Sequence, residues 1–197
     1  MKKIPTLFVR EYENHKITNI TSEFTNEECK KALFEGIPTL KFDGSCCAII
    51  DGKFYKRYDA KKGKTIPENA IKCQEEPDQI TGHMPCWVPV DENNPADKWF
   101  MQAYKTYLSE NHGYIKNGTY EAIGEHFQGN PYYLGYDILE PHGEVVLEDF
   151  KINPNEDYFE QVKNYLTKLN GEGIVFWLDN EPICKIKRTD FGLNWNK

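Results

Sequence analysis

Residues 39–50 read TLKFDGSCCAII, and Lys41 stands in this run between an extended entry and a glycine turn. The flanking segments, IPTLK at 37–41 and SCCAII at 45–50, are short and rich in residues that strands favour. The Asp-Gly dipeptide between them is typical of a tight turn. The pattern therefore predicts two strands, with a lysine at the end of the first.

A β-hairpin is predicted directly after this run. Asp-Gly at 51–52 separates the second strand from KFYKRY at 53–58, and this arrangement is the strongest short-range hairpin signal. A two-residue loop places Arg57 opposite Cys46. Arg57 therefore returns to the turn that carries Lys41.

Near the C-terminus, GEGIVFW and PICKIKR flank an Asp-Asn turn and predict a second hairpin. This turn places Lys187 opposite Glu172. Alternate residues of a strand share a face, so Glu172, Lys185 and Lys187 are expected to form a charged cluster on one side. The opposite, buried side is expected to hold Val175 and Trp177 of the first strand and Ile186 or Cys184 of the second.

The rest of the chain predicts a mixture of helices and strands. Capping signals and apolar residues at helical spacing predict helices over 24–36, 95–113 and 155–171. Two further strands, over 118–124 and 132–139, would carry Glu121 and Tyr136, while the Pro-rich segment 65–95 is expected to be irregular. We therefore predict an α+β fold with antiparallel sheets, in a single domain over residues 1–197.

Composition restricts the compartment. No stretch approaches the roughly 20 apolar residues of a membrane span, and the start MKKIPTLFVR lacks the apolar core of a secretory signal. We expect an intracellular, cytoplasmic protein with no membrane partner. Its six cysteines form no C-x-x-C pair and are expected to be reduced; Cys73, His83 and Cys86 alone make an incomplete zinc set.

The net charge of −7 argues against a general nucleic-acid coat, because phosphate binding relies on clustered cations. The segment KFYKRYDAKKGK at 53–64 is a local basic exception. A solvated surface is the plainer interpretation of such a run.

Lys41 is a candidate nucleophile. A free lysine has a pKa of about 10.4, so it needs burial or nearby cations to lose its proton near pH 7. Arg57, Lys185 and Lys187 would supply cations, and the same cations would hold a polyphosphate. Glu172 and a divalent metal would complete a phosphoryl- or nucleotidyl-transfer site. The alternative is a surface lysine beside a turn.

Six motifs occur in order along the chain: KFDG at 41–44, an arginine at 57, YEAIG at 120–124, YLGYDIL at 133–139, EGIVF at 172–176 and KIK at 185–187. In order and spacing they resemble the motifs of covalent nucleotidyltransferases, which include ATP-dependent DNA and RNA ligases and mRNA capping enzymes. The segments between them look most like a family of small ATP-dependent 5′-to-3′ RNA ligases with vertebrate, microbial and viral members. The resemblance covers nearly the whole chain and implies an ATP-grasp-like nucleotidyltransferase domain of antiparallel sheets flanked by helices.

The resemblance implies a role for each matching residue. Lys41 would attack the α-phosphate of ATP and form a lysyl-AMP. Arg57 and Glu121 would contact the sugar and phosphate side of the nucleotide. Tyr136 would stack on adenine, although a core aromatic is the competing interpretation because strand aromatics mostly pack.

Glu172 would help bind Mg²⁺ or Mn²⁺, and Lys185 and Lys187 would hold the α-phosphate. Asp43 would order the turn or bind the metal through water. AMP would then pass to the 5′-phosphate of an RNA end, and a 3′-hydroxyl would displace it.

One departure from the family concerns the C-terminus. Many relatives append an OB-type domain, whereas ten residues follow Lys187 here, so we expect no such domain. A monomer would then engage RNA through its catalytic domain, or with a partner's help. The residues expected to bind RNA are the cations Lys53, Lys56, Lys61, Lys62 and Lys64.

Three alternatives stay open. A minimal DNA ligase or a GTP-dependent capping guanylyltransferase would use the same lysine chemistry. An inactive nucleotide- or RNA-binding module would retain the motifs without the reaction.

Overall fold

The computed structural model describes residues 1–13, 16–79 and 81–195. The chain divides into two compact units: unit 1 comprises residues 1–3 and 43–142, and unit 2 comprises residues 4–42 and the stretch from Gly143 onward. Both are built from antiparallel sheets with few helices, so the α+β prediction is confirmed. The single domain over residues 1–197 stays a prediction, and each unit is described by itself.

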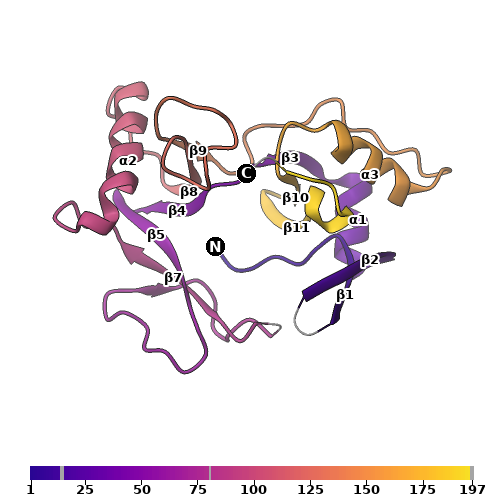
Figure 1. Cartoon of the computed structure of the whole chain (residues 1–197), viewed down its shortest axis with the longest axis horizontal. Helices are drawn as coiled ribbons and strands as arrows, with labels where there is room; N and C mark the ends of the chain where they lie inside the picture. Colours follow the sequence, from indigo (N-terminus) through magenta and orange to yellow (C-terminus); the bar gives the residue numbers. More distant parts are fainter. Residues whose placement is uncertain (14–15, 80, 196–197) are drawn as a thin grey trace. The chain divides into compact units, whose positions relative to one another are not determined.

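Unit 1 contains a six-stranded sheet in the order β6-β7-β5-β4-β8-β9, with every neighbouring pair antiparallel (Figure 1). Its strands are β4 (Ser45–Ile50), β5 (Lys53–Ala60), β6 (Ile71–Lys72), β7 (Met84–Pro89), β8 (Gly118–Ile123) and β9 (Ile138–Pro141). A short 3-10 helix, η1 (Pro95–Asp97), leads into helix α2 (Lys98–Glu110).

The β4–β5 hairpin confirms the Asp-Gly prediction. Asp51 and Gly52 have φ of 49° and 74°, the left-handed values that a tight two-residue hairpin loop requires. Ile50 pairs with Lys53 across the loop, and the same alignment continues along both strands. The local turn chemistry therefore decided the register of this hairpin.

The prediction that segment 65–95 is irregular is wrong for β7. Pro85 lies within this strand, and its carbonyl oxygen accepts a hydrogen bond from Cys73 N–H at 2.9 Å, on the side of β6. In an antiparallel strand the N–H and C=O of one residue point to the same neighbouring strand. The N–H that Pro85 lacks would therefore have pointed to β6, which is only two residues long. Few ladder hydrogen bonds are lost there.

The strand predicted over 132–139 is also corrected. The strand observed, β9, begins only at Ile138, so Tyr136 and Asp137 lie in the loop before it. Asp137 is fully buried and accepts from His126 N–H at 3.0 Å. The hydrogen bond between Asp137 and His126 thus fixes the loop before β9, where no strand pairing is present.

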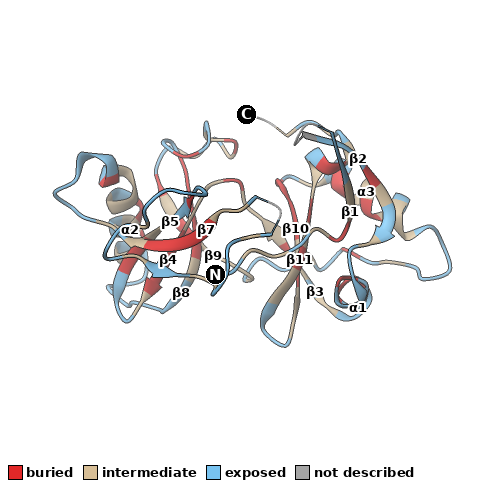
Figure 2. Cartoon of the chain, turned by 90° about the horizontal axis from the view of Figure 1, so that it is seen from below, coloured by how far each residue is buried: buried red, intermediate tan, exposed pale blue. Residues whose placement is uncertain are grey.

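The core of unit 1 lies between one face of the sheet and α2. Cys47, Ile49 and Phe54 of the sheet pack with Ala103 and Tyr107 of the helix. Figure 2 shows buried residues concentrated along β4 and β7. Cys46, next to Cys47, belongs to the other face of the sheet.

Unit 2 contains a three-stranded sheet in the order β11-β10-β3 and a separate β1–β2 hairpin. Its strands are β1 (Phe8–Glu13), β2 (Lys16–Phe24), β3 (Ile37–Lys41), β10 (Gly173–Leu178) and β11 (Glu181–Lys187). Its helices are α1 (Glu27–Glu35), α3 (Tyr158–Lys168) and the 3-10 helix η2 (Arg188–Phe191). The three predicted α-helices, including α2, are therefore confirmed with shorter bounds, whereas β1 and β2 were not predicted.

The register of the β10–β11 hairpin differs from the prediction by one residue. The Asp-Asn turn is present, but a bulge follows: Trp177 pairs with Pro182, and Phe176 already pairs with Cys184. Proline has no N–H to donate, and a bulge is where a strand accommodates it. Beyond the bulge, Lys187 therefore pairs with Gly173 and not with Glu172.

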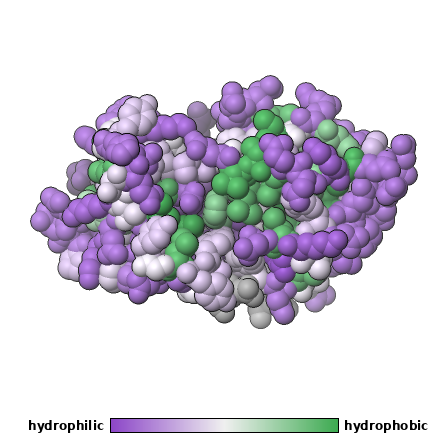
Figure 3. Space-filling view, turned by 90° about the horizontal axis from the view of Figure 1, so that it is seen from above, coloured by the Kyte–Doolittle hydropathy of each residue, from purple (hydrophilic) through white to green (hydrophobic). Residues whose placement is uncertain are grey.

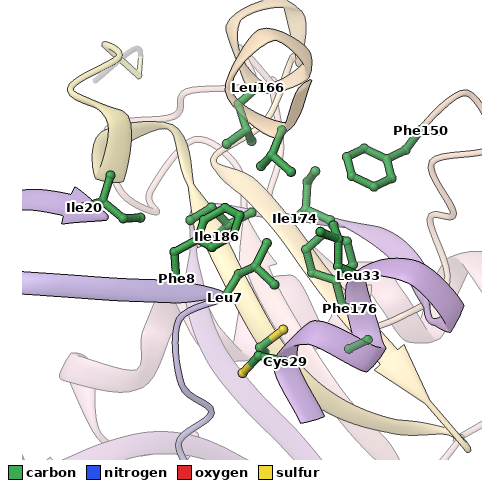
Figure 4. Close-up of a cluster of buried hydrophobic side chains, with 13 residues drawn as sticks. Leu7, Phe8, Ile20, Cys29, Leu33, Phe150, Leu166, Ile174, Phe176 and Ile186 are labelled. Atoms are coloured by element: carbon green, nitrogen blue, oxygen red, sulfur yellow. The ribbon is translucent and has the colours of Figure 1, made fainter. Parts of the chain in front are cut away.

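A one-residue slip exchanges the two faces of a strand. The prediction that Val175 and Trp177 are buried is accordingly wrong. Ile174 and Phe176 are the fully buried residues of β10. The predicted burial of Ile186 and Cys184 on β11 is confirmed. Figure 4 shows the side chains of Ile174, Phe176 and Ile186 in the core of unit 2 with residues of α1 and α3.

Large apolar side chains are also exposed in places. Ile37 is 53% exposed and Tyr133 is 81% exposed. Figure 3 shows green, hydrophobic side chains at the surface among mostly hydrophilic ones. Across the part of the chain that the structure describes, no helix combines the length and apolar character that crossing a membrane requires.

Candidate functional site

Lys41, Gly173 and Lys187 lie side by side across the three strands of the unit 2 sheet. Gly173 of β10 pairs with Lys41 of β3 on one side and with Lys187 of β11 on the other. A Cβ atom on Gly173 would lie 2.1 Å from the carbonyl oxygen of Ile186, so only glycine fits. Because glycine has no side chain, the two lysine side chains can converge over it.

Glu172 joins the two lysines. It directly precedes β10, and its N–H donates to the carbonyl oxygen of Lys41 at 3.1 Å. Lys41 Nζ donates to Oε2 of Glu172, and Lys187 Nζ donates to Oε1. Both oxygens of this buried carboxylate therefore accept a charge-assisted hydrogen bond.

The charge of Glu172 is stabilised by these contacts. Burial alone would raise the pKa of its carboxyl, because burial disfavours the charged form. The ammonium groups of Lys41 and Lys187 outweigh burial and hold the pKa below its ordinary value. Glu172 is thus ionised at neutral pH and fixes both lysine side chains in position.

Lys185 is the third cation of this cluster. On the outer side of β11, the N–H of Lys185 donates to the carbonyl oxygen of Pro5, and its carbonyl oxygen accepts from the N–H of Leu7. Burial, followed by the charges of Lys41, Lys187 and Arg10, lowers the pKa of Lys185 to about 8. The positive charges around Lys185 therefore exceed the single negative charge of Glu172.

Arg10 and Asp190 belong to the same surroundings and were missed by the sequence analysis. Arg10 of β1 donates from Nη2 to Oδ1 of Asp190 at 2.5 Å. The other oxygen of Asp190 accepts from the N–H of Lys187 at 2.8 Å. No motif marks Arg10; the only signal was that the chain has few arginines, and an N-terminal hairpin was not predicted.

The remaining predicted nucleotide ligands lie in unit 1. Arg57 of β5 donates from Nη1 to the carbonyl oxygen of Met1 and from Nε to Asp59, both at 2.7 Å. Its guanidinium carbon lies 5.7 Å from the centre of the Trp87 ring. Its charge lowers the pKa of the neighbouring Cys46 thiol, against the larger effect of burial. The β4–β5 pairs end at Cys47 and Lys56, one residue before the predicted pair of Cys46 with Arg57.

Glu121 lies in a different kind of cluster. It stands directly opposite Cys46 in the β8–β4 pairing, and its Oε2 is 2.9 Å from Nε2 of His142. The Nδ1 atom of His142 is 3.0 Å from the hydroxyl oxygen of Thr119. Burial, and secondarily the charge of Glu121, raises the pKa of the Cys46 thiol to about 12. No sequence motif connects Cys46, Glu121 and His142, because they are far apart in the chain.

Tyr136 and Asp43 are the last predicted site residues of unit 1. Tyr136 is 48% exposed, so its interpretation as a core aromatic is wrong. Asp43 is largely buried, and its N–H donates to the hydroxyl oxygen of Tyr132 at 2.6 Å. Adenine stacking by Tyr136 and metal binding by Asp43 stay predictions.

The five lysines expected to bind RNA, here called the basic strip, fall into two groups. Lys56 donates from Nζ to the buried carboxylate of Asp97 at the start of α2, which is a structural contact. The other members of the strip, Lys53, Lys61, Lys62 and Lys64, are exposed.

The unit 2 cluster is chemically suited to an anion. Three ammonium groups and the Arg10 guanidinium surround two carboxylates, and such an excess of fixed positive charge favours phosphate oxygens. A divalent cation fits less well beside Glu172, because both of its oxygens already accept from ammonium groups. Magnesium would instead bind largely through the phosphates of a nucleotide.

Comparisons with known proteins agree with an RNA-ligase-like chain. No protein-family model matches it. It is 25% identical to the protein named RNA ligase 1 from Pongo abelii in an alignment 275 positions long, gaps included, which covers 98% of this chain and 82% of that protein. It is 31% identical to RNA ligase 1 from Danio rerio in an alignment 141 positions long, gaps included, which covers 58% of this chain and 42% of that protein. The Rattus norvegicus protein of the same name is 24% identical over 98% of this chain.

Proposed function

We propose that this protein is an ATP-dependent RNA ligase that works through a lysyl-AMP intermediate. The observation that carries the proposal is the convergence of Lys41, Lys187 and Lys185 around Glu172 in unit 2. The RNA ligase 1 proteins to which the chain is similar support RNA as the substrate. The cytoplasm, where RNA ends are accessible, is the proposed location.

In the first step, Lys41 gives its proton to solvent after it leaves Glu172, and its neutral Nζ attacks the α-phosphorus of ATP. A P–N bond forms, the P–O bond to the β-phosphate breaks, and pyrophosphate leaves with the bonding electrons. Lys185 and Lys187 contribute positive charge that stabilises the developing negative charge on the α-phosphate. A divalent ion bound with ATP supplies further charge neutralisation of the phosphates.

Lys41 must exchange Glu172 for the phosphate before it reacts. An ammonium group held by a carboxylate keeps its proton, so the ion pair represents the resting arrangement. When the phosphates of ATP bind to Lys187 and Lys185, the ion pair between Lys41 and Glu172 can break. Glu172 then acts by positioning the lysines before the substrate arrives.

In the second step, an oxygen of an RNA 5′-phosphate attacks the α-phosphorus, and the P–N bond to Lys41 breaks. In the third step, a 3′-hydroxyl attacks the activated 5′-phosphate and loses its proton, a phosphodiester forms and AMP leaves. Arg57, Glu121 and Tyr136 are proposed to hold the nucleotide. The exposed lysines of the basic strip are proposed to guide the RNA.

The proposal is tested by incubating the full chain with Mg²⁺ and ATP labelled at the α-phosphate. We expect label that survives denaturation and alkali but is released by acid, as a phosphoramidate is. Lys41→Arg should abolish it, because arginine keeps its proton, whereas Lys31→Arg, on the exposed face of α1, should not change it. Equal labelling of Lys41→Arg and the unchanged chain would refute the site.

Substrate choice then separates the alternatives. Joining of all-RNA strands with 5′-phosphate and 3′-hydroxyl ends should exceed joining of all-DNA strands under matched salt, if a 2′-hydroxyl is read at the junction. Equal joining of RNA and DNA strands would favour a DNA ligase. Covalent labelling by GTP but not by ATP would favour a capping enzyme. Nucleotide binding without covalent label would leave only a binding module.

A further inference from the structure

Unit 1 contains two metal-ligand side chains that the proposed reaction does not use, Cys46 and His142, and both lie beside Glu121, which is proposed to hold the nucleotide. Sγ of Cys46, a carboxylate oxygen of Glu121 and a ring nitrogen of His142 all lie within 4.8 Å of one another. We propose that these three residues bind a divalent transition-metal ion of the zinc class. By contrast, Cys73, His83 and Cys86, the set considered from the sequence, form no such group among the described residues.

Strand pairing brings the three side chains together. Cys46 on β4 and Glu121 on β8 are direct cross-strand partners, so their side chains point to the same face of the sheet. His142 follows β9, and its N–H donates to the carbonyl oxygen of Thr119 at 3.0 Å, which extends the β8–β9 pairing. Thr119 and Glu121 are two residues apart on β8 and share that face. Figure 1 shows β4, β8 and β9 close together within unit 1.

The separations suit a tetrahedral ion. Bonds of about 2.0 Å to nitrogen and oxygen and about 2.3 Å to sulfur place neighbouring ligand atoms about 3.3 to 3.8 Å apart. The His142 and Glu121 atoms are 2.9 Å apart, and no pair in the group exceeds 4.8 Å. Small side-chain rotations therefore bring all three atoms to bonding distance, without movement of the strands.

The orientation of His142 is already fixed. Its Nδ1 atom is 3.0 Å from the hydroxyl oxygen of Thr119, and this contact directs Nε2 toward Glu121. In metal sites a histidine ligand almost always has its second ring nitrogen held by a hydrogen-bond acceptor. Thr119 is thus in the position of a supporting residue for a metal ligand.

The donor set distinguishes the ion. Thiolate and imidazole prefer Zn²⁺ and its neighbours among the first-row metals, whereas Mg²⁺ prefers oxygen donors. Three protein ligands leave a fourth position open to water or another ligand. Cys46 loses its proton to solvent when the ion binds.

The experiment uses the full chain, stripped with a chelator and free of nucleotide. Zn²⁺ is titrated against a coloured competing chelator, and Co²⁺ is added separately as a spectroscopic probe. We expect one equivalent of Zn²⁺ and a Co²⁺ adduct with a thiolate-to-metal charge-transfer band. Because the readout is metal binding, its failure would leave the proposed ligase function untouched.

Variants locate the ion. Cys46→Ser should abolish the charge-transfer band and weaken Zn²⁺ binding at least about 100-fold, and Thr119→Val, which retains all three ligands, should weaken it about 10-fold. Cys47→Ser is the matched control: it lies on the opposite face, and a serine hydroxyl can replace its Sγ contact with the carbonyl oxygen of Tyr120. Unchanged Zn²⁺ binding by a folded Cys46→Ser variant would overturn the proposal.

Discussion

The two units each bury a glutamate, and the two carboxylates have opposite kinds of neighbour. Glu172 in unit 2 accepts hydrogen bonds from the ammonium groups of Lys41 and Lys187. Glu121 in unit 1 lies beside an imidazole and opposite a thiol. Glu172 holds two lysine side chains in place, within a cluster where positive charge exceeds negative charge. Glu121 is surrounded by groups that can share a cation with it.

This difference has an energetic side. A buried ion pair is strongly unfavourable to break from one side, because the remaining charge is left without a partner. Glu121 has an imidazole and a thiol as its neighbours, so replacing Glu121 leaves no lysine ammonium group without a partner and fewer buried groups unsatisfied. Replacing each glutamate in turn therefore tests whether the two sites differ as their neighbours suggest.

The largest expected effect is on nucleotidyl transfer. Glu172→Ala and Lys187→Ala should each slow formation of the covalent adduct by about 100-fold or more. Glu172 is proposed to position Lys41, and Lys187 to stabilise negative charge on the α-phosphate. Glu121→Ala should mainly raise the ATP concentration needed for half-maximal labelling. Single-turnover labelling at several ATP concentrations measures both quantities. A loss of only a few fold in both unit 2 variants would remove the basis of the comparison.

The next effect is on stability. Glu172→Ala should lower the free energy of unfolding by about 2 to 4 kcal/mol, and Glu121→Ala by about 1 to 3 kcal/mol. The Glu172 contribution is present above the ordinary carboxyl pKa of 4.5 and is lost as pH falls below it, because its folded-state pKa is lower still. Urea denaturation at pH 7 and pH 4 checks both statements. A more destabilising Glu121→Ala variant would reverse the comparison.

Lys185 should show a stability effect of the opposite sign. Its folded-state pKa of about 8 lies below the ordinary 10.5, so the unfolded chain binds more protons between these values. Stability of the unchanged protein should rise with pH across that window. Lys185→Met should stabilise the fold by about 1 to 3 kcal/mol at pH 7, an advantage that shrinks toward pH 10, while labelling falls. Thermal unfolding at pH 7, 8.5 and 10 measures the trend; a destabilised variant at pH 7 would contradict it.

The smallest effect concerns the exposed part of the basic strip. Replacing Lys61, Lys62 and Lys64 by alanine should leave covalent labelling unchanged but weaken RNA joining, and should reduce the slope of log affinity against log salt by about 2. The control replaces three exposed lysines of unit 2 helices, Lys30, Lys31 and Lys168. An equal loss in both triple variants would show that only net charge matters.

The features of this protein that depend on short segments could be predicted from the amino-acid sequence. The β4–β5 hairpin followed from an Asp-Gly pair whose φ values suit the loop, and the three helices followed from caps and periodicity. The motif order pointed to Lys41, Glu172 and Lys187 before any contact among them was known. These signals are local because turn geometry and helix capping involve only neighbouring residues.

The features that depend on residues far apart in the chain are seen only in the folded protein. Pro182 shifts the β10–β11 register through a bulge, and that shift buries Ile174 and Phe176 in place of Val175 and Trp177. The β1 strand brings Arg10 to Asp190, which is 180 residues away. Cys46, Glu121 and His142 meet because three strands pair across a sheet. Such encounters are set by long-range strand pairing and packing, which no short stretch of the chain specifies.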